Sequence, residues 1–327
     1  MNKNFWKNKR ILITGFEGFL GSNLVKELLK TEAKVVGVDI QTFRKETVLL
    51  PTDYKKMHVC KGNITNYKRL QKILQEHSIN IIFHLAAEAL VGPGQKDPRK
   101  TFKTNITGTC EVLEAARQQG NLQAIIVASS DKAYGYHQKL PYREDAPLLA
   151  NHPYDVSKSC ADLIAQTYFH TYRLPVAVTR CGNIYGPGDF HFSRIVPETI
   201  RCAHKKETLL IRSNGKFTRD YIFIDDVVAG YILVAEKLKS LSLAGEAFNL
   251  SNERPKTVID IVNMIYRFMD KKPNYRILNK ARYEIKEQSL SAAKAHRILG
   301  WKPTYNLRDG LKKTLPWYLT YFSKSNA

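Results

Sequence analysis

The sequence predicts an α/β protein with a doubly wound parallel sheet and a smaller C-terminal lobe. Up to about residue 180, short apolar segments rich in β-branched residues alternate with amphipathic segments of helical period. This alternation is typical of right-handed crossovers in a parallel sheet. From residue 181 onward glycine and proline become frequent and the segments shorten, which indicates a second lobe. With 327 residues, 43% of them hydrophobic, the chain can bury such a core.

The first predicted strand, residues 9–15, leads into a glycine-rich turn. Gly15, Gly18 and Gly21 follow it at regular spacing, and a helix is expected over 22–30. Glycines at this spacing allow a tight turn and a close approach to a pyrophosphate, and the helix N-terminus supplies amide donors. The segment therefore predicts a dinucleotide site of the Rossmann type.

The second predicted strand, residues 34–39, ends in Asp39. A carboxylate at this place can accept hydrogen bonds from ribose hydroxyls and repels a 2′-phosphate, so it favours NAD over NADP. Arg44 and Lys45 lie close enough in sequence to leave NADP open. An ordinary acid at a strand-ending turn is the alternative interpretation of Asp39.

The middle of the sheet is expected to carry small and polar residues toward the ligand. Ala86 and Ala87 would let a cofactor pass close to the backbone, while His84 is interpreted as a packed strand residue rather than a catalyst. Asn105 is unfavourable inside a helix, so we expect it to have a polar task within the fold. In chain order we expect a strand and loop over 58–64, a helix over 66–77, a strand over 79–87, a helix over 99–119 and a strand over 123–129.

The polar residues 129–132 follow the last of these strands, and ligands bind at the carboxyl ends of strands in such sheets. Tyr154 and Lys158 stand four apart at the start of a helical pattern, so they share one face. An ammonium beside a phenol lowers the pKa of the phenol and makes it a usable base.

Two domains are expected from these patterns. Residues 1–180 form the NAD-binding Rossmann domain, to which 219–245 returns, and residues 181–327 form the lobe for the substrate. The remaining elements are a helix over 154–172, a strand over 174–180, and helices over 227–238, 257–269 and 307–321.

Composition narrows the class of protein. The five cysteines show no CxxC spacing, so we expect reduced thiols in a cytoplasmic protein and no metal site. No stretch approaches the roughly 18 apolar residues of a membrane span. The net charge of +21 allows three interpretations. The surface is simply rich in solvated lysine, or a positive field attracts an anionic substrate and cofactor, or the protein binds nucleic acid or a membrane. We expect no nucleic acid or membrane partner, because the sequence has no recognisable motif for either.

Taken together, the motifs resemble the extended short-chain dehydrogenase/reductase family that acts on nucleotide sugars. This resemblance implies bound NAD, a nucleotide sugar held by the C-terminal lobe, and a homodimer. The motifs are Gly15-x-x-Gly18-x-x-Gly21, Leu85-Ala-Ala87, Asn105, Ser129 and Ser130, Tyr154-x-x-x-Lys158, 183–187 and 219–226. The cofactor-binding residues implied are Gly15, Gly18, Phe19, Leu20, Gly21, Asp39, Asn63, Ile64, Leu85, Ala86, Ala87, Asn105, Tyr154 and Lys158.

Within that family, Ser130-Asp131-Lys132 resembles the CDP-glucose 4,6-dehydratases, in which this triplet replaces Thr-Asp-Glu. Two stretches depart from the pattern. Asn63 stands where the family usually has aspartate, and residues 219–226 resemble the broader epimerase and dehydratase pattern. The nucleotide base and the hexose therefore stay open.

The chemistry that we expect begins with oxidation at C4 of the sugar. Tyr154 takes the proton of the 4-hydroxyl, Lys158 holds the phenolate, and Ser130 hydrogen-bonds the developing ketone. Asp131 is then the acid at the C6 hydroxyl, and Lys132 is the base at C5 if burial near Lys158 lowers its pKa. The alternative is structural, with Asp131 capping a turn and Lys132 pointing to solvent.

Guanidinium groups grip phosphate oxygens in pairs, so arginines of the C-terminal lobe are candidates for the substrate diphosphate. The leading hypothesis is an NAD-dependent 4,6-dehydratase acting on a CDP-glucose-like NDP-hexose. Its rivals are a 4-epimerase or decarboxylase on the same scaffold and, in a different class, an NAD-bound regulator or an anion-binding scaffold protein. The substrate-binding candidates are Asn183, Arg194, Arg212 and Arg219.

Overall fold

A computed structural model of the chain describes residues 1–281 and 284–325. Its centre is a seven-stranded sheet in the order β11-β6-β5-β4-β1-β2-β3, and every pairing within it is parallel. A smaller C-terminal region adjoins it, so the predicted fold class is confirmed. The strands are β1 (Arg10–Thr14), β2 (Lys34–Asp39), β3 (Met57–Lys61), β4 (Ile81–His84), β5 (Ala124–Ala128), β6 (Val176–Cys181) and β11 (Ala247–Leu250).

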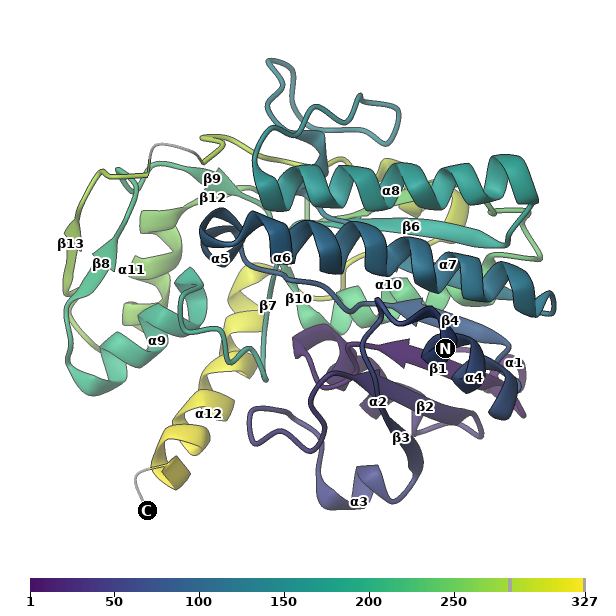
Figure 1. Cartoon of the computed structure of the whole chain (residues 1–327). Helices are drawn as coiled ribbons and strands as arrows, with labels where there is room; N and C mark the ends of the chain where they lie inside the picture. The colour runs from purple at the N-terminus through teal and green to yellow at the C-terminus, as the bar shows by residue number, and fades with distance from the viewer. Residues whose placement is uncertain (282–283, 326–327) are drawn as a thin grey trace.

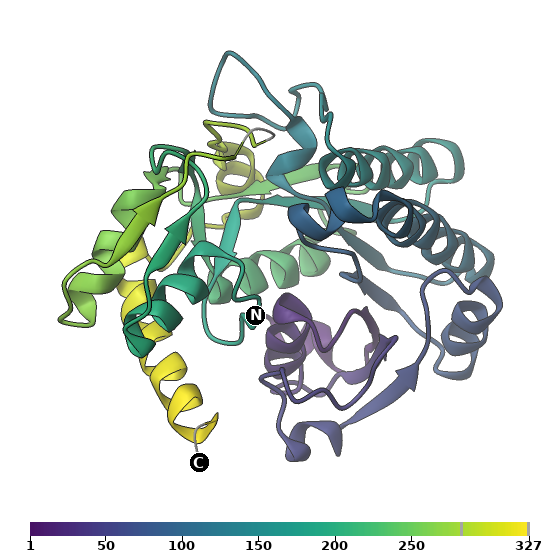
Figure 2. The ribbon, with the colours of Figure 1, turned by 60° about the vertical axis from the view of Figure 1, so that its left-hand side comes forward.

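Both faces of the sheet are covered by helices (Figures 1 and 2). The helices α4 (Tyr67–Glu76), α7 (Gly108–Gln119) and α8 (Pro153–Tyr172) lie side by side on one face, and α2 (Phe19–Leu28) and α10 (Ile224–Lys237) lie on the other. Alternate residues of β1 serve the two cores, because successive strand side chains point to opposite faces. Leu12 packs with the first group of helices, and Ile11 and Ile13 pack with the second.

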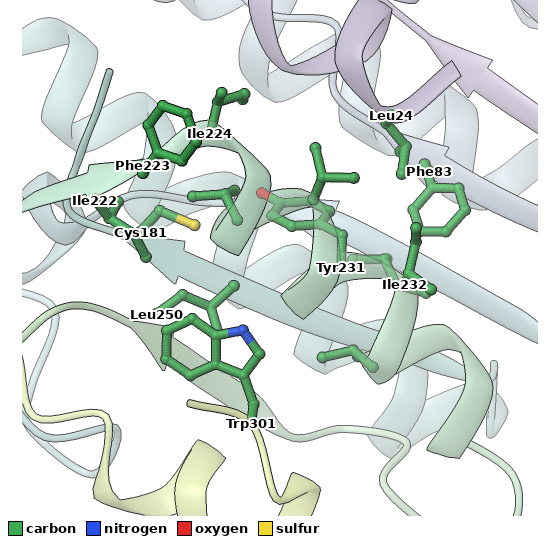
Figure 3. Packing of buried hydrophobic residues seen from close by; sticks show 14 of the residues in the cluster. Leu24, Phe83, Cys181, Ile222, Phe223, Ile224, Tyr231, Ile232, Leu250 and Trp301 are labelled. Atoms are coloured by element: carbon green, nitrogen blue, oxygen red, sulfur yellow. The ribbon is translucent and has the colours of Figure 1, made fainter. Parts of the chain in front are cut away.

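Helix α10 carries much of the larger core. Figure 3 shows Tyr231 of α10 among buried side chains of distant segments, including Phe83, Leu250 and Trp301. The indole N–H of Trp301 donates to the Asp226 carbonyl at 3.1 Å. The segment expected to return from the C-terminal lobe thus lies against β5 and β6. Strand β11, which follows this helix and forms one edge of the sheet, was not predicted from the sequence.

The long helix predicted over 99–119 is interrupted. It consists of α6 (Pro98–Phe102), a π-helical turn η1 (Lys103–Thr107) and α7. Asn105 lies in that turn and is 2% exposed. π-helical turns of this kind occur frequently at functional sites.

The C-terminal region is built of small sheets and three helices. Strand β7 pairs with β10, β8 with β13, and β9 with β12. Among the described residues no helix is long and apolar enough to cross a membrane, and no group of three or more His, Cys, Asp or Glu side chains is arranged to hold a metal ion. The strands here are β7 (Asn183–Tyr185), β8 (Leu209–Ile211), β9 (Thr218–Arg219), β10 (Tyr221–Phe223), β12 (Lys256–Thr257) and β13 (Tyr275–Ile277). The remaining helices and turns are α1 (Lys3–Trp6), α3 (Pro51–Tyr54), α5 (Val91–Lys96), η2 (Asp131–Tyr134), α9 (Ile195–Lys205), α11 (Val258–Phe268), η3 (Ala295–Leu299) and α12 (Leu307–Ser325).

Candidate active site

A cavity of about 1120 Å³ extends from the glycine turn across the carboxyl edge of the sheet into the C-terminal region. It lies where strand order reverses, between β1 and β4, which is the usual ligand site of such sheets. It is lined by all of the predicted site residues except Asn105.

The glycine turn is packed too closely against neighbouring backbone to accept side chains. Gly15 has φ +70°, and a Cβ on Gly21 would lie 2.2 Å from the Gly15 carbonyl oxygen. Gly18 precedes helix α2 and supplies no side-chain cap, so the amides of the first turn keep their donors for a ligand. This backbone cradle fits the pyrophosphate of a dinucleotide.

Asp39 lies at the end of β2 and is paired with Arg44. Its Oδ1 accepts from the Arg44 Nη2 at 2.6 Å and from the Ile40 N–H at 2.8 Å. Burial raises the pKa of Asp39, and Arg44 acts in the lowering direction. Glu17, which the sequence did not single out, lies beside this pair and accepts from the Phe43 N–H at 2.7 Å and from the Tyr54 hydroxyl. The end of the cavity near β2 therefore combines a carboxylate with a guanidinium.

Asn105 does not line the cavity, so its assignment as a cofactor ligand stays a prediction. Its side chain binds both backbone groups of Glu88, accepting from the N–H at 2.8 Å and donating to the carbonyl at 3.1 Å. It also donates to the Ser157 hydroxyl at 2.8 Å. Asn105 thus ties the loop after β4 to helix α8. His84 is likewise a packed residue, held by Thr14 and Thr109.

Tyr154 and Lys158 both begin helix α8 and line the cavity, but their electrostatics differ from the expectation. Burial raises the pKa of Tyr154 to about 12, while Arg194 and a hydrogen bond with Ser130 act in the lowering direction. The Lys158 ammonium instead donates to the Ala128 carbonyl at 2.8 Å. Burial also lowers the pKa of Lys158 to about 8. Burial therefore raises the pKa of Tyr154 in this structure, and a lowering contribution from Lys158 stays a prediction.

Ser130 caps the short helical turn that presents the next two residues. Its hydroxyl donates to Asp131 Oδ1 at 3.0 Å and accepts from the Lys132 N–H at 3.2 Å. The Asp131 side chain is 3% exposed. Asp131 and Lys132 both line the cavity, so the alternative in which Lys132 points to solvent does not hold.

The environment of Lys132 is not the one that a neutral base needs. Its ammonium donates to Gln288 Oε1 at 2.7 Å and lies 3.8 Å from Asp131 Oδ1. Two acceptors stabilise a charged ammonium. Lys132 as the base stays a prediction; in this structure its ammonium has a hydrogen bond to Gln288 and an ion pair with Asp131.

The four substrate candidates of the C-terminal region also line the cavity. Arg194 pairs with Asp189 at 3.2 Å, and Arg212 donates to the Ser193 carbonyl at 3.0 Å. Arg219 donates to the Thr218 carbonyl at 2.8 Å and is 6% exposed. Asn183 lies at the start of β7. The fold thus brings three guanidinium groups of the C-terminal region to the cavity wall.

Two residues that line the cavity, Gln288 and Asp155, were not predicted from the sequence. Gln288 contacts Lys132 across 156 positions, and no local pattern signals such a contact. Asp155 is buried, lines the cavity, and follows Tyr154 directly. Its adjacency to Tyr154 at the start of a helix was the available signal.

Comparison with known proteins gives concordant results. The family described as GDP-mannose 4,6 dehydratase matches residues 12–314. A CDP-glucose 4,6-dehydratase of Salmonella typhimurium is 31% identical over 97% of this chain and 92% of its own. A UDP-glucuronate 4-epimerase of Thermodesulfobacterium geofontis is 30% identical over 94% of this chain and 95% of its own. The structure of a dTDP-glucose 4,6-dehydratase of Streptomyces venezuelae, with NAD bound, superimposes with a TM-score of 0.87 at 26% identity, covering 96% of this chain and 98% of that one.

Proposed function

The chain belongs to the extended short-chain dehydrogenase/reductase family of NDP-sugar epimerases and dehydratases, and we propose that it is a 4,6-dehydratase. Members of both activities lie at about 30% identity, so the family by itself indicates an NAD-dependent enzyme that modifies NDP-sugars. The proposed substrate is a CDP-glucose-like NDP-hexose. The proposed product is the NDP-4-keto-6-deoxyhexose.

The observation that carries this proposal is the ionisable pair next to Ser130. Asp131 is buried in the cavity wall, and Lys132 lies beside it. An epimerase needs only to oxidise and reduce C4, whereas loss of water across C5 and C6 needs an acid and a base. A buried carboxyl adjacent to the oxidation site supplies that acid.

NAD would lie in the glycine cradle with its ribose near Asp39, and when bound it supplies hydride transfer from C4 and back to C6. Tyr154 then accepts the proton of the 4-hydroxyl, and Ser130 donates to the oxygen that becomes the ketone. Lys158 keeps a positive charge close to that oxygen. Asp131 protonates the leaving hydroxyl at C6.

We further propose that the region after residue 181 holds the nucleotide sugar. Arg194, Arg212 and Arg219 line the cavity, and their charges suit a diphosphate. We also propose a homodimer through α7 and α8, where Leu163 is 53% exposed and Tyr172 is 52% exposed. Light scattering after gel filtration gives the molar mass that tests the dimer.

A panel of nucleotide hexoses tests the reaction. Purified protein with NAD is incubated with CDP-glucose, dTDP-glucose, UDP-glucose and GDP-mannose, and the products are analysed by mass spectrometry. We expect loss of one water from at least one substrate, with a product that absorbs near-ultraviolet light in alkali. An isomer of unchanged mass would instead establish epimerisation.

A further inference from the structure

Glu17 is a buried acid in the middle of the glycine turn, between Gly15 and Gly18. Its side chain has no exposed surface, and it does not line the cavity. The turn is the proposed place of a pyrophosphate, and a carboxylate close to a phosphate repels it. An acid at this position therefore needs a compensating role.

One oxygen of Glu17 anchors the segment 40–50, which connects β2 to α3. Its Oε1 accepts from the Phe43 N–H at 2.7 Å and from the Arg44 N–H at 3.3 Å. It also accepts from the hydroxyl of Tyr54, at the end of α3. Phe43 has φ +61°, a left-handed conformation that a residue with a side chain keeps only where its surroundings hold it. Glu17 thus fixes this segment on the glycine turn.

The guanidinium group of Arg44 lies between two carboxylates. Its Nη2 donates to Asp39 Oδ1 at 2.6 Å, and its Nε lies 3.9 Å from Glu17 Oε2. Among the described residues neither that Nε nor that Oε2 has a hydrogen-bond partner, and both atoms are buried. The Arg44 side chain is 30% exposed and lines the cavity, as Asp39 does. Glu17, which is shielded from the cavity, therefore acts on it through Arg44.

The balance of charge at the end of β2 bears on the choice of cofactor. Two carboxylates, Asp39 and Glu17, face the single guanidinium of Arg44, which leaves one net negative charge. A phosphate on the 2′-hydroxyl of the ribose carries about two negative charges at neutral pH. Without Glu17 the charges of Arg44 and Asp39 would cancel, and the guanidinium could turn to a phosphate more freely.

We propose that Glu17 is a positioning residue that selects NAD over NADP, by holding the Arg44 guanidinium and leaving one negative charge uncompensated at the end of β2. The inference rests on the proposed dinucleotide site at the glycine turn. It adds to Asp39 a second acid, whose effect passes through the arginine. Its test measures binding alone, so it applies equally to a dehydratase and to an epimerase.

The test is the variant Glu17→Gln, which keeps the shape of the side chain and an oxygen that accepts from the Phe43 and Arg44 N–H groups. Titration calorimetry gives the dissociation constants of NAD and NADP. We expect the ratio of the NADP constant to the NAD constant to fall about five- to tenfold, the size of one partly exposed charge interaction. Glu46→Gln, which removes an exposed carboxylate of the same segment outside the cavity, is the matched control and should leave the ratio unchanged.

Two further variants separate charge from anchoring. Tyr54→Phe removes one donor to Glu17 without changing any charge, so the ratio should stay at its wild-type value. The double variant Glu17→Gln with Arg44→Ala should have the same ratio as Arg44→Ala alone, within about twofold, because the effect of Glu17 requires the arginine.

An unchanged ratio in Glu17→Gln overturns the proposal. An equal loss of affinity for both cofactors overturns it too, since Glu17 would then only support the turn. A ratio that still falls when Glu17→Gln is added to Arg44→Ala would show that the charge acts without the arginine, which also contradicts the proposal.

Thermal melting shows whether Glu17→Gln folds. If it does not, Glu17→Asp decides the question, because its shorter side chain draws the carboxylate away from Arg44 and should lower the ratio by a smaller factor. An unchanged ratio in Glu17→Asp would then overturn the proposal. A wild-type protein that binds neither dinucleotide contradicts the proposed site at the glycine turn, and the inference fails with it.

Discussion

The two ends of the cavity are built on different principles. At the glycine turn, Gly15, Gly18 and Gly21 make a cradle of backbone atoms within one short stretch of chain. Around Asp131, the site depends on charges from separate segments, with Arg219 and Gln288 arriving from the C-terminal region. We therefore expect a single added carbon to disrupt the first end, and a single removed charge or hydroxyl to disrupt the second.

The largest effect is expected where the chemistry depends on one oxygen. Tyr154→Phe keeps the ring and removes the phenol, so turnover should fall about 10²- to 10⁴-fold. Binding of NAD, followed by calorimetry, should be retained, because the glycine cradle is untouched. Tyr136→Phe, at a tyrosine that is 63% exposed, is the control. Unaltered turnover in Tyr154→Phe would remove the phenol from the mechanism.

The next largest effect is expected at the buried ion pair between Arg180 and Asp162. Arg180 Nε donates to Asp162 Oδ2 at 2.7 Å, and Arg180 Nη1 donates to the Tyr134 hydroxyl at 2.8 Å. Arg180→Met leaves the buried Asp162 carboxylate without its ion-pair partner, with only the hydrogen bond from Gln166, so the free energy of unfolding should fall by about 3–5 kcal/mol in urea titrations. Replacing both partners, as Arg180→Met with Asp162→Leu, should cost less than Arg180→Met alone. A double variant that is less stable than the single would contradict this account.

The glycine end is tested by adding one methyl group. Gly21→Ala brings a Cβ to 2.2 Å from the Gly15 carbonyl oxygen, so the turn must open. We expect a loss of about 1–3 kcal/mol in stability and a matching rise in the dissociation constant of NAD. Gly92→Ala is the control for stability, since a Cβ there meets nothing within 4 Å. Unchanged NAD affinity in Gly21→Ala would show that the cradle tolerates side chains.

A pH profile sharpens the view that charge governs the other end. Burial lowers the pKa of Lys158 to about 8, so its ammonium is present below that pH and is lost as the pH rises through it. If the charge is needed, kcat/KM should fall about tenfold per pH unit above about 8. Lys158→Arg keeps its charge and should lack this limb. A limb that persists unchanged in Lys158→Arg must come from another group.

The smallest effect is expected at the ion pair between Asp39 and Arg44. Arg44→Ala frees Asp39 from its partner, so the carboxylate should repel a 2′-phosphate more strongly. We expect the preference for NAD over NADP to rise by about 1 kcal/mol, the size of a partly exposed ion pair. Binding constants for both cofactors measure it. A preference that shifts toward NADP would show that Arg44 does not assist phosphate binding.

Prediction from sequence succeeded where one segment determines its own geometry. The strand ending in Asp39, the turn beginning at Gly15 and the helix carrying Tyr154 all lie within a few residues of their expected limits. The π-helical turn at Asn105 and the edge strand β11 were not predicted from the sequence. The first follows from hydrogen bonds to Glu88 and Ser157, and the second depends on a neighbouring strand in space.

The order of strands and helices, the glycine turn and the residue types that line the cavity could be predicted from the sequence. Periodicity and glycine sterics act over short stretches of chain, so they can be read locally. Only the tertiary structure decided the charge environment: it turned Lys158 toward Ala128, set Lys132 against Gln288 and left Asp155 with a free oxygen. Burial and the distances between charges fix such environments, and both arise when segments far apart in the chain come together.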